Sequence, residues 1–299
     1  MLLLVRCTAL AVLVCSTMVH AKESGGTLDT IRQTRTLNVG IREGARPFSF
    51  FSEQGKPEGY AMEFCNRVIN SIRKEVRGAD LRVNFIPVTA TNRVEKIKSG
   101  AVDFECGQTV NTKSRQEDVD FSYAIFISGE QFMSRAGSGL NNLNSLDGKV
   151  VATIKGSTAE KLFARLHDSG MANVKLISYA SNEEAMKALE SGKVSAFAQL
   201  DVTLESLRSQ AADPSRFVVS KESLSVEPNC IMLRRDDAEL KKLINNAVRS
   251  LLASSEFNPM YDKWFKSGGL NITASHMLRD SVNRPSDEPA FALVLGNAL

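Results

Sequence analysis

The chain has 299 residues, of which 43 % are hydrophobic and 24 % are charged, so it is long enough for two domains with sizeable cores. Its 37 basic and 34 acidic side chains are interspersed and leave a net charge of only +3, which points to neither a nucleic-acid nor a membrane-surface partner. The three dispersed histidines and the lack of CxxC and HExxH motifs favour neither a metal site nor any cofactor.

The first 21 residues are typical of a secretory signal peptide. Arg6 stands in a run rich in Leu, Val and Ala, and the segment ends in the small-residue pattern Val19-His20-Ala21. A membrane anchor would need about 18 uninterrupted apolar residues, whereas polar residues break this run. We therefore expect a soluble periplasmic protein whose signal peptide is cleaved after Ala21.

Strands and helices alternate after a polar linker at residues 22–26. The pattern predicts helices over 28–35, 61–76 and 91–99, strands over 36–41 and 81–88, and an aromatic hairpin over 48–59. Residues 101–122 then predict a buried strand that ends at Gly107, a polar turn, a helix start at 112–115 and a second strand. This alternation indicates a mostly parallel sheet of the α/β class.

The same organisation starts again after an extended connection at residues 126–135. The predicted strands cover 149–154, 174–179 and 194–200, and the predicted helices cover 156–167, 182–191 and 202–210. A return strand at 227–233, a long helix at 237–253 and the Trp-containing segment 259–265 follow. Residues 271–299 are weakly patterned, so we expect a tail that wraps the surface or frays.

Three cysteines remain once the leader is removed, and an oxidising compartment favours pairing of two of them. Cys106 ends one predicted strand and Cys230 begins another, so we expect a Cys106–Cys230 disulfide. Such a link would stabilise the fold by about 4 to 5 kcal/mol through the entropy of the unfolded chain. Cys65 lies on a predicted helix face and is expected to be a small buried thiol.

Polar and charged residues stand where predicted strands end, which is where open α/β sheets bind ligands. They are Arg42, Thr91 to Arg93, Arg115, Gly156-Ser157-Thr158, Asn182 and Asp201. Each alone is more often a helix cap or a solvated charge, but their shared placement is the stronger signal. Three arginines on one unit would form a cationic wall that suits a ligand with more than one carboxylate.

The turn after Gly107 offers backbone N–H groups, a helix start and Arg115, a combination that binds carboxylates. The alternative is that Arg115 pairs with Glu117 or Asp118 on a solvated turn. Ser157 or Thr158 can cap the next helix, which leaves that helix N-terminus free to bind an anion as well.

From about residue 27 to residue 268 the chain resembles the extracytoplasmic amino-acid-binding proteins of ABC importers, most closely their glutamate/aspartate-binding branch. The resemblance is carried by IREGARPFSFF, ATNRVEKIKSGAVDFECGQTVNTKSRQ, VDFS, GKVVATIKGSTAE, EEAMKALESGKVSAFAQLD, CIMLRRDD and YDKWF. It implies an α/β, two-lobed periplasmic-binding-protein fold of type II with two hinge strands. On this pattern, residues 27–127 and 231–270 form lobe 1, residues 128–230 form lobe 2 with the hinge strands, and 271–299 form the C-terminal tail.

The resemblance also implies roles for single residues. Arg115 matches the arginine that clamps the ligand α-carboxylate, and Thr158 matches a hydroxyl from the opposite lobe that reaches the same group. Arg42 and Arg93 match the arginines that hold the side-chain carboxylate of glutamate or aspartate. In the family that this chain resembles, members that bind basic amino acids have a residue of the opposite charge at the position of Arg42, which supports an acidic ligand here.

Some positions depart from the family pattern. Gln108 and Val110 stand where hydroxyl residues are usual, although a backbone N–H could serve there, and Asn182 replaces a histidine that helps to hold the side chain. Leu200 occupies the place of the acid that receives the α-ammonium, and Asp201 follows it. A shift of one residue on a strand turns a side chain to the other face unless the strand end corrects it.

The resulting prediction is a monomeric periplasmic solute-binding protein that captures an acidic amino acid for an inner-membrane ABC permease. Without the amine anchor, the alternative ligand is a non-amino dicarboxylate. A second alternative is a dehydratase-like enzyme for a small carboxylic acid on the same scaffold. That enzyme would need a general acid or base facing the ligand, for which Glu43 and Asp201 are the nearby candidates.

Overall fold

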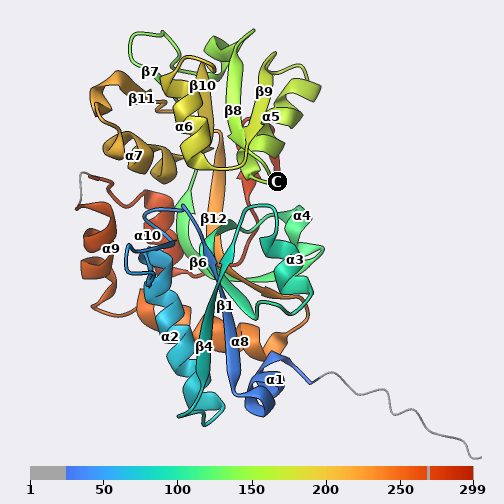
Figure 1. Cartoon of the computed structure of the whole chain (residues 1–299). Helices are drawn as coiled ribbons and strands as arrows, with labels where there is room; N and C mark the ends of the chain where they lie inside the picture. Colours follow the sequence, from blue (N-terminus) through green and yellow to red (C-terminus); the bar gives the residue numbers. More distant parts are fainter. Residues whose placement is uncertain (1–24, 268–269, 299) are drawn as a thin grey trace, which may run out of the picture.

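The computed structural model describes residues 25–267 and 270–298 (Figure 1). The chain forms two lobes, and each lobe is built around its own β-sheet with helices packed on it (Figure 1). The predicted signal peptide, residues 1–21, lies outside the described residues, so its cleavage stays a prediction. Within the described part of the chain, no helix combines the length and apolar character needed to cross a membrane.

The first lobe contains the larger sheet. Its strands are β1 (Thr36–Arg42), β4 (Arg82–Val88), β5 (Phe104–Val110), β6 (Val119–Ser128), β12 (Ser225–Arg234), β13 (Phe291–Ala292) and β14 (Asn297–Ala298). The order is β14-β13-β12-β5-β1-β4, and β6 also pairs with β12. Because β4, β1 and β5 run parallel, their carboxyl ends lie at the same edge of the sheet.

Helices cover both faces of this sheet. They are α1 (Thr27–Thr34), α2 (Tyr60–Glu75), α3 (Arg93–Lys98), α4 (Lys113–Gln116), α8 (Ala238–Leu252), α9 (Phe257–Phe265) and α10 (His276–Asn283), and the small hairpin β2 (Phe50–Phe51) and β3 (Pro57–Glu58) precedes α2. Phe48, Tyr60, Phe126 and Phe265 pack their rings together in the core. Gly59 starts α2 with a φ of 129°, and a Cβ there would lie 2.2 Å from the Phe48 carbonyl oxygen, so only glycine fits.

The second lobe holds the smaller sheet, in the order β11-β7-β10-β8-β9. Its elements are β7 (Glu130–Arg135), β8 (Val150–Ile154), β9 (Lys175–Tyr179), β10 (Ala196–Leu200), β11 (Phe217–Val219), α5 (Thr158–Asp168), α6 (Asn182–Glu190), α7 (Asp201–Gln210) and the 3₁₀ turns η1 (Leu143–Leu146) and η2 (Pro214–Arg216). β8 and β10 are parallel neighbours, so both strands end at the edge that faces the first lobe.

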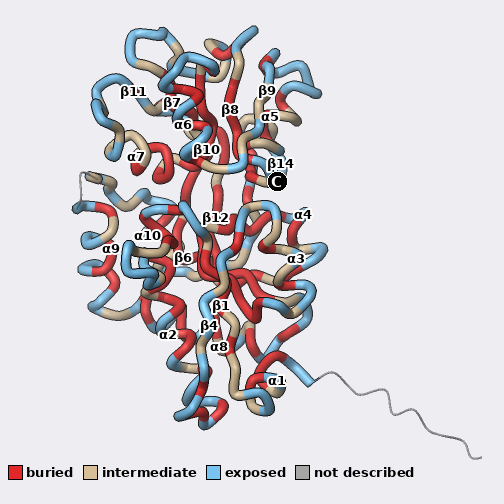
Figure 2. The backbone as a smooth tube through the Cα atoms, in the orientation of Figure 1, coloured by how far each residue is buried: buried red, intermediate tan, exposed pale blue. Residues whose placement is uncertain are grey.

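Two strands carry the chain between the lobes. β6 continues into β7 through Gly129, and β12 returns beside it with Glu227 opposite Ser128. A Cβ on Gly129 would lie 2.9 Å from the Ser225 carbonyl oxygen, closer than ordinary van der Waals contact, so this crossing favours glycine. Figure 2 shows that the buried residues continue along β12 from one lobe into the other. The expected two-lobed α/β fold with two hinge strands is confirmed.

The C-terminal tail also contacts both lobes. Leu278 of α10 is buried in the core of the first lobe, whereas Ala290 and Ala292 are buried in the core of the second. Between them, the Ala124 N–H donates to the Ser286 carbonyl at 2.9 Å, and the Ala290 N–H donates to the Asn111 carbonyl at 2.8 Å. The sequence predicts that residues 271–299 either wrap the surface or fray, and in the structure the tail wraps the surface.

The expected Cys106–Cys230 disulfide is wrong. Cys106 on β5 bonds to Cys65 on α2, with their Cα atoms 6.2 Å apart. Although Cys106 and Cys230 lie on neighbouring strands, Cys106 packs in the cluster under α2 and Cys230 in the cluster under α3, on opposite faces of the sheet. Cys230 is a buried free thiol, and burial raises its pKa.

Candidate functional site

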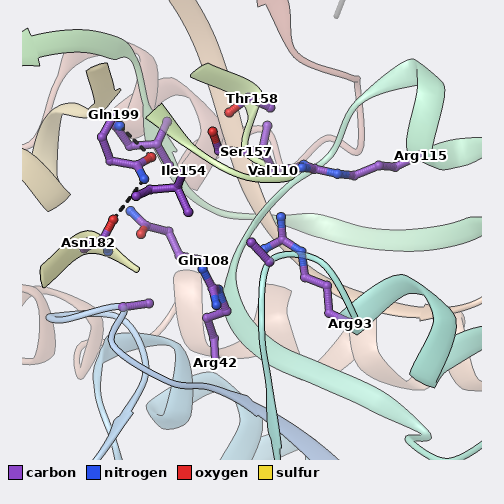
Figure 3. Close-up of a pocket in the computed structure, with 13 residues that line it drawn as sticks. Arg42, Arg93, Gln108, Val110, Arg115, Ile154, Ser157, Thr158, Asn182 and Gln199 are labelled. Carbon is purple, nitrogen blue, oxygen red and sulfur yellow. Dashed lines mark hydrogen bonds between the residues drawn. The ribbon is translucent and has the colours of Figure 1, made fainter. Parts of the chain in front are cut away.

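A pocket of about 410 Å³, including its open mouth, lies between the two lobes (Figure 3). Its walls are built where strands end and helices begin, because parallel strands bring their carboxyl ends to one edge. The lining residues are Arg42, Ala45, Ala90, Arg93, Gln108, Val110, Arg115, Ile154, Ser157, Thr158, Asn182, Gln199 and Leu200. Of the residues to which the resemblance gives a ligand contact, only Asp201 lies outside this set, and among the other strand-end candidates Thr91, Asn92 and Gly156 also lie outside it.

Arg42 and Arg93 form the cationic wall of the first lobe. Arg42 is the last residue of β1 and Arg93 the first of α3, and Figure 3 shows both guanidinium groups directed into the pocket. Burial and then the neighbouring charge of Arg93 lower the pKa of Arg42 to about 10. An anion placed between the two cations would relieve this repulsion, so the wall is preset for a carboxylate.

Only part of the donor capacity of this wall is used within the protein. One Nη of Arg93 donates to Thr109 Oγ1 at 2.7 Å, while its Nε is buried without a hydrogen-bond partner in the described part of the chain. No hydrogen bond from the Arg42 guanidinium to another described residue is found. Each guanidinium has five N–H donors, so most donors of Arg42 and Arg93 are left without a partner among the described residues and are free to bond a ligand in the pocket.

Glu105, on β5 behind the arginines, was missed by the sequence reasoning. The sequence predicts a buried strand here without giving Glu105 a role, and in the structure β5 is buried on both faces and Glu105 is fully buried. Its charge acts favourably on Arg42, Arg93 and Arg115, while burial raises its own pKa. Glu105 thus offsets at most one of the three positive charges, so the site stays cationic.

Arg115 connects the first lobe to the start of α5. Its two Nη atoms donate to the carbonyl oxygens of Val110 at 2.8 Å and of Gly156, in the other lobe, at 3.1 Å. Burial and the charge of Arg93 lower its pKa to about 9. The alternative surface pairing is not what the structure shows, because Asp118 pairs with Lys98 and Arg115 is buried.

The N-terminus of α5 lies beside Arg115, which donates to the carbonyl of Gly156 just before this helix. Ser157 caps the helix by accepting from the Glu160 N–H at 3.1 Å, and Thr158 is the first helical residue. The following backbone N–H groups and the helix dipole favour an anion at this end. A second carboxylate site therefore lies opposite the wall formed by Arg42 and Arg93.

Gln108 and Asn182 each form a hydrogen bond between the two lobes. Gln108 Oε1 accepts from the Thr203 hydroxyl at 2.8 Å, and Asn182 Nδ2 donates to the Gly44 carbonyl at 3.1 Å. Gln199, which the sequence reasoning did not single out, donates to Asn182 Oδ1 at 3.2 Å. With the Arg115 contact, these bonds hold the lobes in a closed arrangement.

Asp201 does not face the pocket. It begins α7, where its carboxylate accepts from the Val202 N–H at 2.7 Å, and burial raises its pKa to about 6. Leu200 lines the pocket instead, so the strand end does not correct the shift of one residue. Within residues 25–267 and 270–298, no acidic side chain lines the pocket, and Glu43 is likewise outside its walls.

Comparison with known proteins agrees with this architecture. Residues 37–267 match the family described as bacterial extracellular solute-binding proteins, family 3. The chain belongs to this family.

Two curated relatives of this solute-binding protein cover nearly its whole length. An L-glutamate/L-aspartate-binding protein of Pseudomonas aeruginosa is 34 % identical over 290 residues, which are 95 % of this chain and 96 % of the relative. A glutamate/aspartate import solute-binding protein of Escherichia coli is 31 % identical over 274 residues, 90 % and 91 % of the two chains.

Solved structures show the same fold. The cysteine-binding protein from Campylobacter jejuni superposes on this solute-binding protein with a TM-score of 0.71 and 26 % identity, covering 84 % of this chain and 96 % of that one. The two-lobed scaffold is therefore shared with binding proteins whose named ligands differ, and ligand choice must come from the pocket residues.

Proposed function

We propose that this solute-binding protein captures glutamate or aspartate and delivers it to an inner-membrane ABC permease. The observation that carries the proposal is the pair of buried, mutually repelling cations, Arg42 and Arg93, placed opposite Arg115 and the α5 N-terminus. Two anion sites in one pocket suit a ligand with two carboxylates. The names of the P. aeruginosa and E. coli relatives support the same ligand class.

Binding would act by lobe closure. The side-chain carboxylate lies between Arg42 and Arg93 of the first lobe, and the α-carboxylate lies between Arg115 and the start of α5 in the second. Because the ligand contacts both lobes, its binding energy favours the closed state over the open one. The lobe bonds made by Gln108 and Asn182 then add to the closed state.

The proposal extends to residue roles, boundaries and location. The ligand contacts are Arg42, Arg93, Gln108, Val110, Arg115, Thr158 and Asn182, in a monomer whose lobes comprise residues 27–127 with 231–270 and residues 128–230. The relatives and the signal-like residues 1–21 support a periplasmic location. The P. aeruginosa and E. coli relatives are named as binding proteins, which supports binding over catalysis.

A non-amino dicarboxylate is the second candidate ligand. Leu200 lines the pocket and Asp201 is turned away, so no wall residue among those described carries a negative charge for an α-ammonium. Three arginines would instead surround a dianion. Glutarate has the two carboxylates of glutamate without the amine, so it isolates this single difference.

Isothermal titration calorimetry with glutamate, aspartate, glutarate and glutamine tests both candidates. We expect glutamate and aspartate to bind and glutamine, which lacks the second carboxylate, to bind at least about 100-fold more weakly. Binding of glutarate above glutamate would replace the first candidate by the second. Equal affinity for glutamine and glutamate would refute the role given to Arg42 and Arg93.

A further inference from the structure

Two buried carboxyl groups lie behind the pocket, where the two hinge strands meet. Glu130 is the first residue of β7 and Glu227 belongs to β12, and neither side chain is exposed at all. Ser225 links them, because its hydroxyl accepts from the Glu130 N–H at 3.1 Å and donates to Glu227 Oε1 at 2.7 Å. The pair therefore belongs to both crossings of the hinge.

Glu130 reaches the pocket through Thr158. Oγ1 of Thr158, which lines the pocket, lies 2.7 Å from Oε1 of Glu130. Glu130 also stands directly opposite Leu200 in the pairing of β7 with β10, so both side chains share one face of the sheet. The carboxyl group of Glu130 is thus one hydroxyl away from the proposed α-carboxylate site.

The hydrogen bonds around Glu130 and Glu227 indicate that at least one of the two carboxyl groups is protonated. The second oxygen of each carboxyl group, Oε2, is buried without a hydrogen-bond partner in the described part of the chain. Two ionised carboxylates would repel each other here, and the Oε2 atom of each would have no hydrogen-bond donor among the described residues. A proton on one of the two groups removes most of this unfavourable free energy. The protein therefore favours a pair with at least one proton.

The surroundings favour that proton on Glu130. Burial and then the charge of Glu227 raise the pKa of Glu130 well above its usual value. Burial raises the pKa of Glu227 only to about 7, because Ser225, Thr158 and Arg115 stabilise its ionised form. Glu227 is therefore the acid that ionises first as pH rises.

The protonation of Glu130 decides what Thr158 can offer a ligand. A threonine hydroxyl has one hydrogen and two lone pairs. If Glu130 is ionised, it takes that hydrogen, and only lone pairs of Thr158 face the ligand carboxylate. If Glu130 is protonated, it donates to Thr158 Oγ1 and releases the Thr158 hydrogen, for which a ligand carboxylate then competes with ionised Glu227.

We propose that Glu130 is a positioning residue which, in its protonated form, turns the Thr158 hydroxyl toward the ligand carboxylate and so couples ligand binding to one proton. The proposal rests on the proposed function only in requiring a carboxylate at the start of α5. The other charged groups that act on Glu130 are Glu227 of β12, Asp201 of α7 and Arg115 of α4.

The sign of the coupling follows from these charges. A bound carboxylate next to Thr158 disfavours a negative charge on Glu130, so the ligand-bound protein holds the proton more tightly than the free protein. Affinity is therefore highest while Glu130 is protonated and falls as pH rises through its titration. One linked proton gives a fall of at most about tenfold per pH unit.

Glu130→Gln tests the proposal, because a glutamine amide keeps the shape of the protonated acid and can donate to Thr158. Titration calorimetry with glutamate and glutarate, from about pH 6 upward, would show wild-type affinity falling as Glu130 ionises, which happens after Glu227 has lost its proton. We expect Glu130→Gln to keep the affinity seen at low pH and to lose the fall. Repeating the titration in buffers of different ionisation enthalpy should show proton uptake by the wild type only.

Two further variants sharpen the test. Glu227→Gln removes the neighbouring charge, so Glu130 should ionise more readily and the fall should start at lower pH. Thr158→Val removes the hydroxyl, so its affinity at low pH should lie below that of the wild type and its fall with rising pH should be smaller, since only the direct repulsion between Glu130 and the ligand carboxylate remains. Thr158→Val also carries the test if Glu130→Gln does not fold.

Three outcomes would overturn the proposal. The first is a Glu130→Gln profile as steep as that of the wild type, which would assign the titration to another group such as Arg115. The second is a loss of glutamate but not glutarate affinity in Glu130→Gln, which would make Glu130 an ionised counter-charge for the ammonium. The third is a wild-type affinity that does not change with pH. By contrast, a wild type that binds neither ligand at any pH would refute the proposed function itself.

Discussion

Replacing Arg42 by methionine is expected to stabilise the empty protein while weakening ligand binding. Arg42 is held close to Arg93, and burial together with that repulsion lowers its pKa from 12.5 to about 10. A shift of that size corresponds to at most about 3 kcal/mol of unfavourable free energy in the folded state. Methionine keeps much of the length of the side chain and removes the charge, so the free energy of unfolding should rise by about 1 to 3 kcal/mol.

The affinity of Arg42→Met should move in the opposite direction. Loss of one buried, charge-assisted partner of a carboxylate costs about 2 to 4 kcal/mol, or about 30- to 700-fold in affinity. Calorimetry with glutamate measures the affinity, and thermal unfolding without ligand measures stability. For a protein of this size the melting temperature should rise by about 2 to 4 °C for each kcal/mol gained.

The matched control is Arg73→Met. Arg73 is an exposed residue of α2, and among the described residues its guanidinium bonds only to the Asn70 side chain, at 3.2 Å, so this change should alter neither quantity appreciably. A fall in the melting temperature of Arg42→Met would refute the reasoning, since it would mean that Arg42 stabilises the fold by pairing with Glu105. Unchanged glutamate affinity would remove Arg42 from the site.

Four other outcomes are expected. Arg115→Ala should abolish measurable glutamate binding in calorimetry, because it removes the cation at the α-carboxylate end. Cys65→Ser should lower the free energy of unfolding by about 4 kcal/mol in denaturant titration, as a loop of 41 residues is released, whereas Cys230→Ala should leave the disulfide intact by thiol assay. Leu200→Asp should raise the ratio of glutamate to glutarate affinity about tenfold or more by calorimetry, because it adds an acid to the pocket wall. The ligand-free melting temperature should fall as pH rises from about 4 to about 7. The reason is that buried carboxyl groups with raised pKa values bind protons more tightly in the folded state than in the unfolded one. These groups include Asp103, Asp201 and Glu227.

Sequence patterns located the pocket because strand ends and helix starts are local features. Arg42 ends β1, Arg93 begins α3 and Asn182 begins α6, and each boundary can be read from alternation, breakers and caps. The parallel strand order then brings these boundaries to one edge, which an alternating α/β pattern already implies.

The missed features depend on tertiary register. Both faces of β5 are covered, so alternation along the strand gave no sign that Glu105 is buried. It also did not show that Cys106 faces α2 while Cys230 faces α3. The position of Asp201 was read correctly, but its side chain bonds to its own helix. The proximity of Glu130 to Thr158 follows only once β7 and α5 have packed.

The C-terminal tail is a third connection between the lobes, in addition to the hinge strands β6 and β12. Its backbone is bonded to β6 through Ser286 and to Asn111 through Ala290, while β13 extends the sheet beside Ser225. The two hinge strands, β6 and β12, run antiparallel. A lobe held by these two strands alone can both bend and twist about them, whereas a third attachment resists the twist. We therefore expect the lobes to open along one fixed arc, which would return Arg115 to the same place beside α5 at every closure.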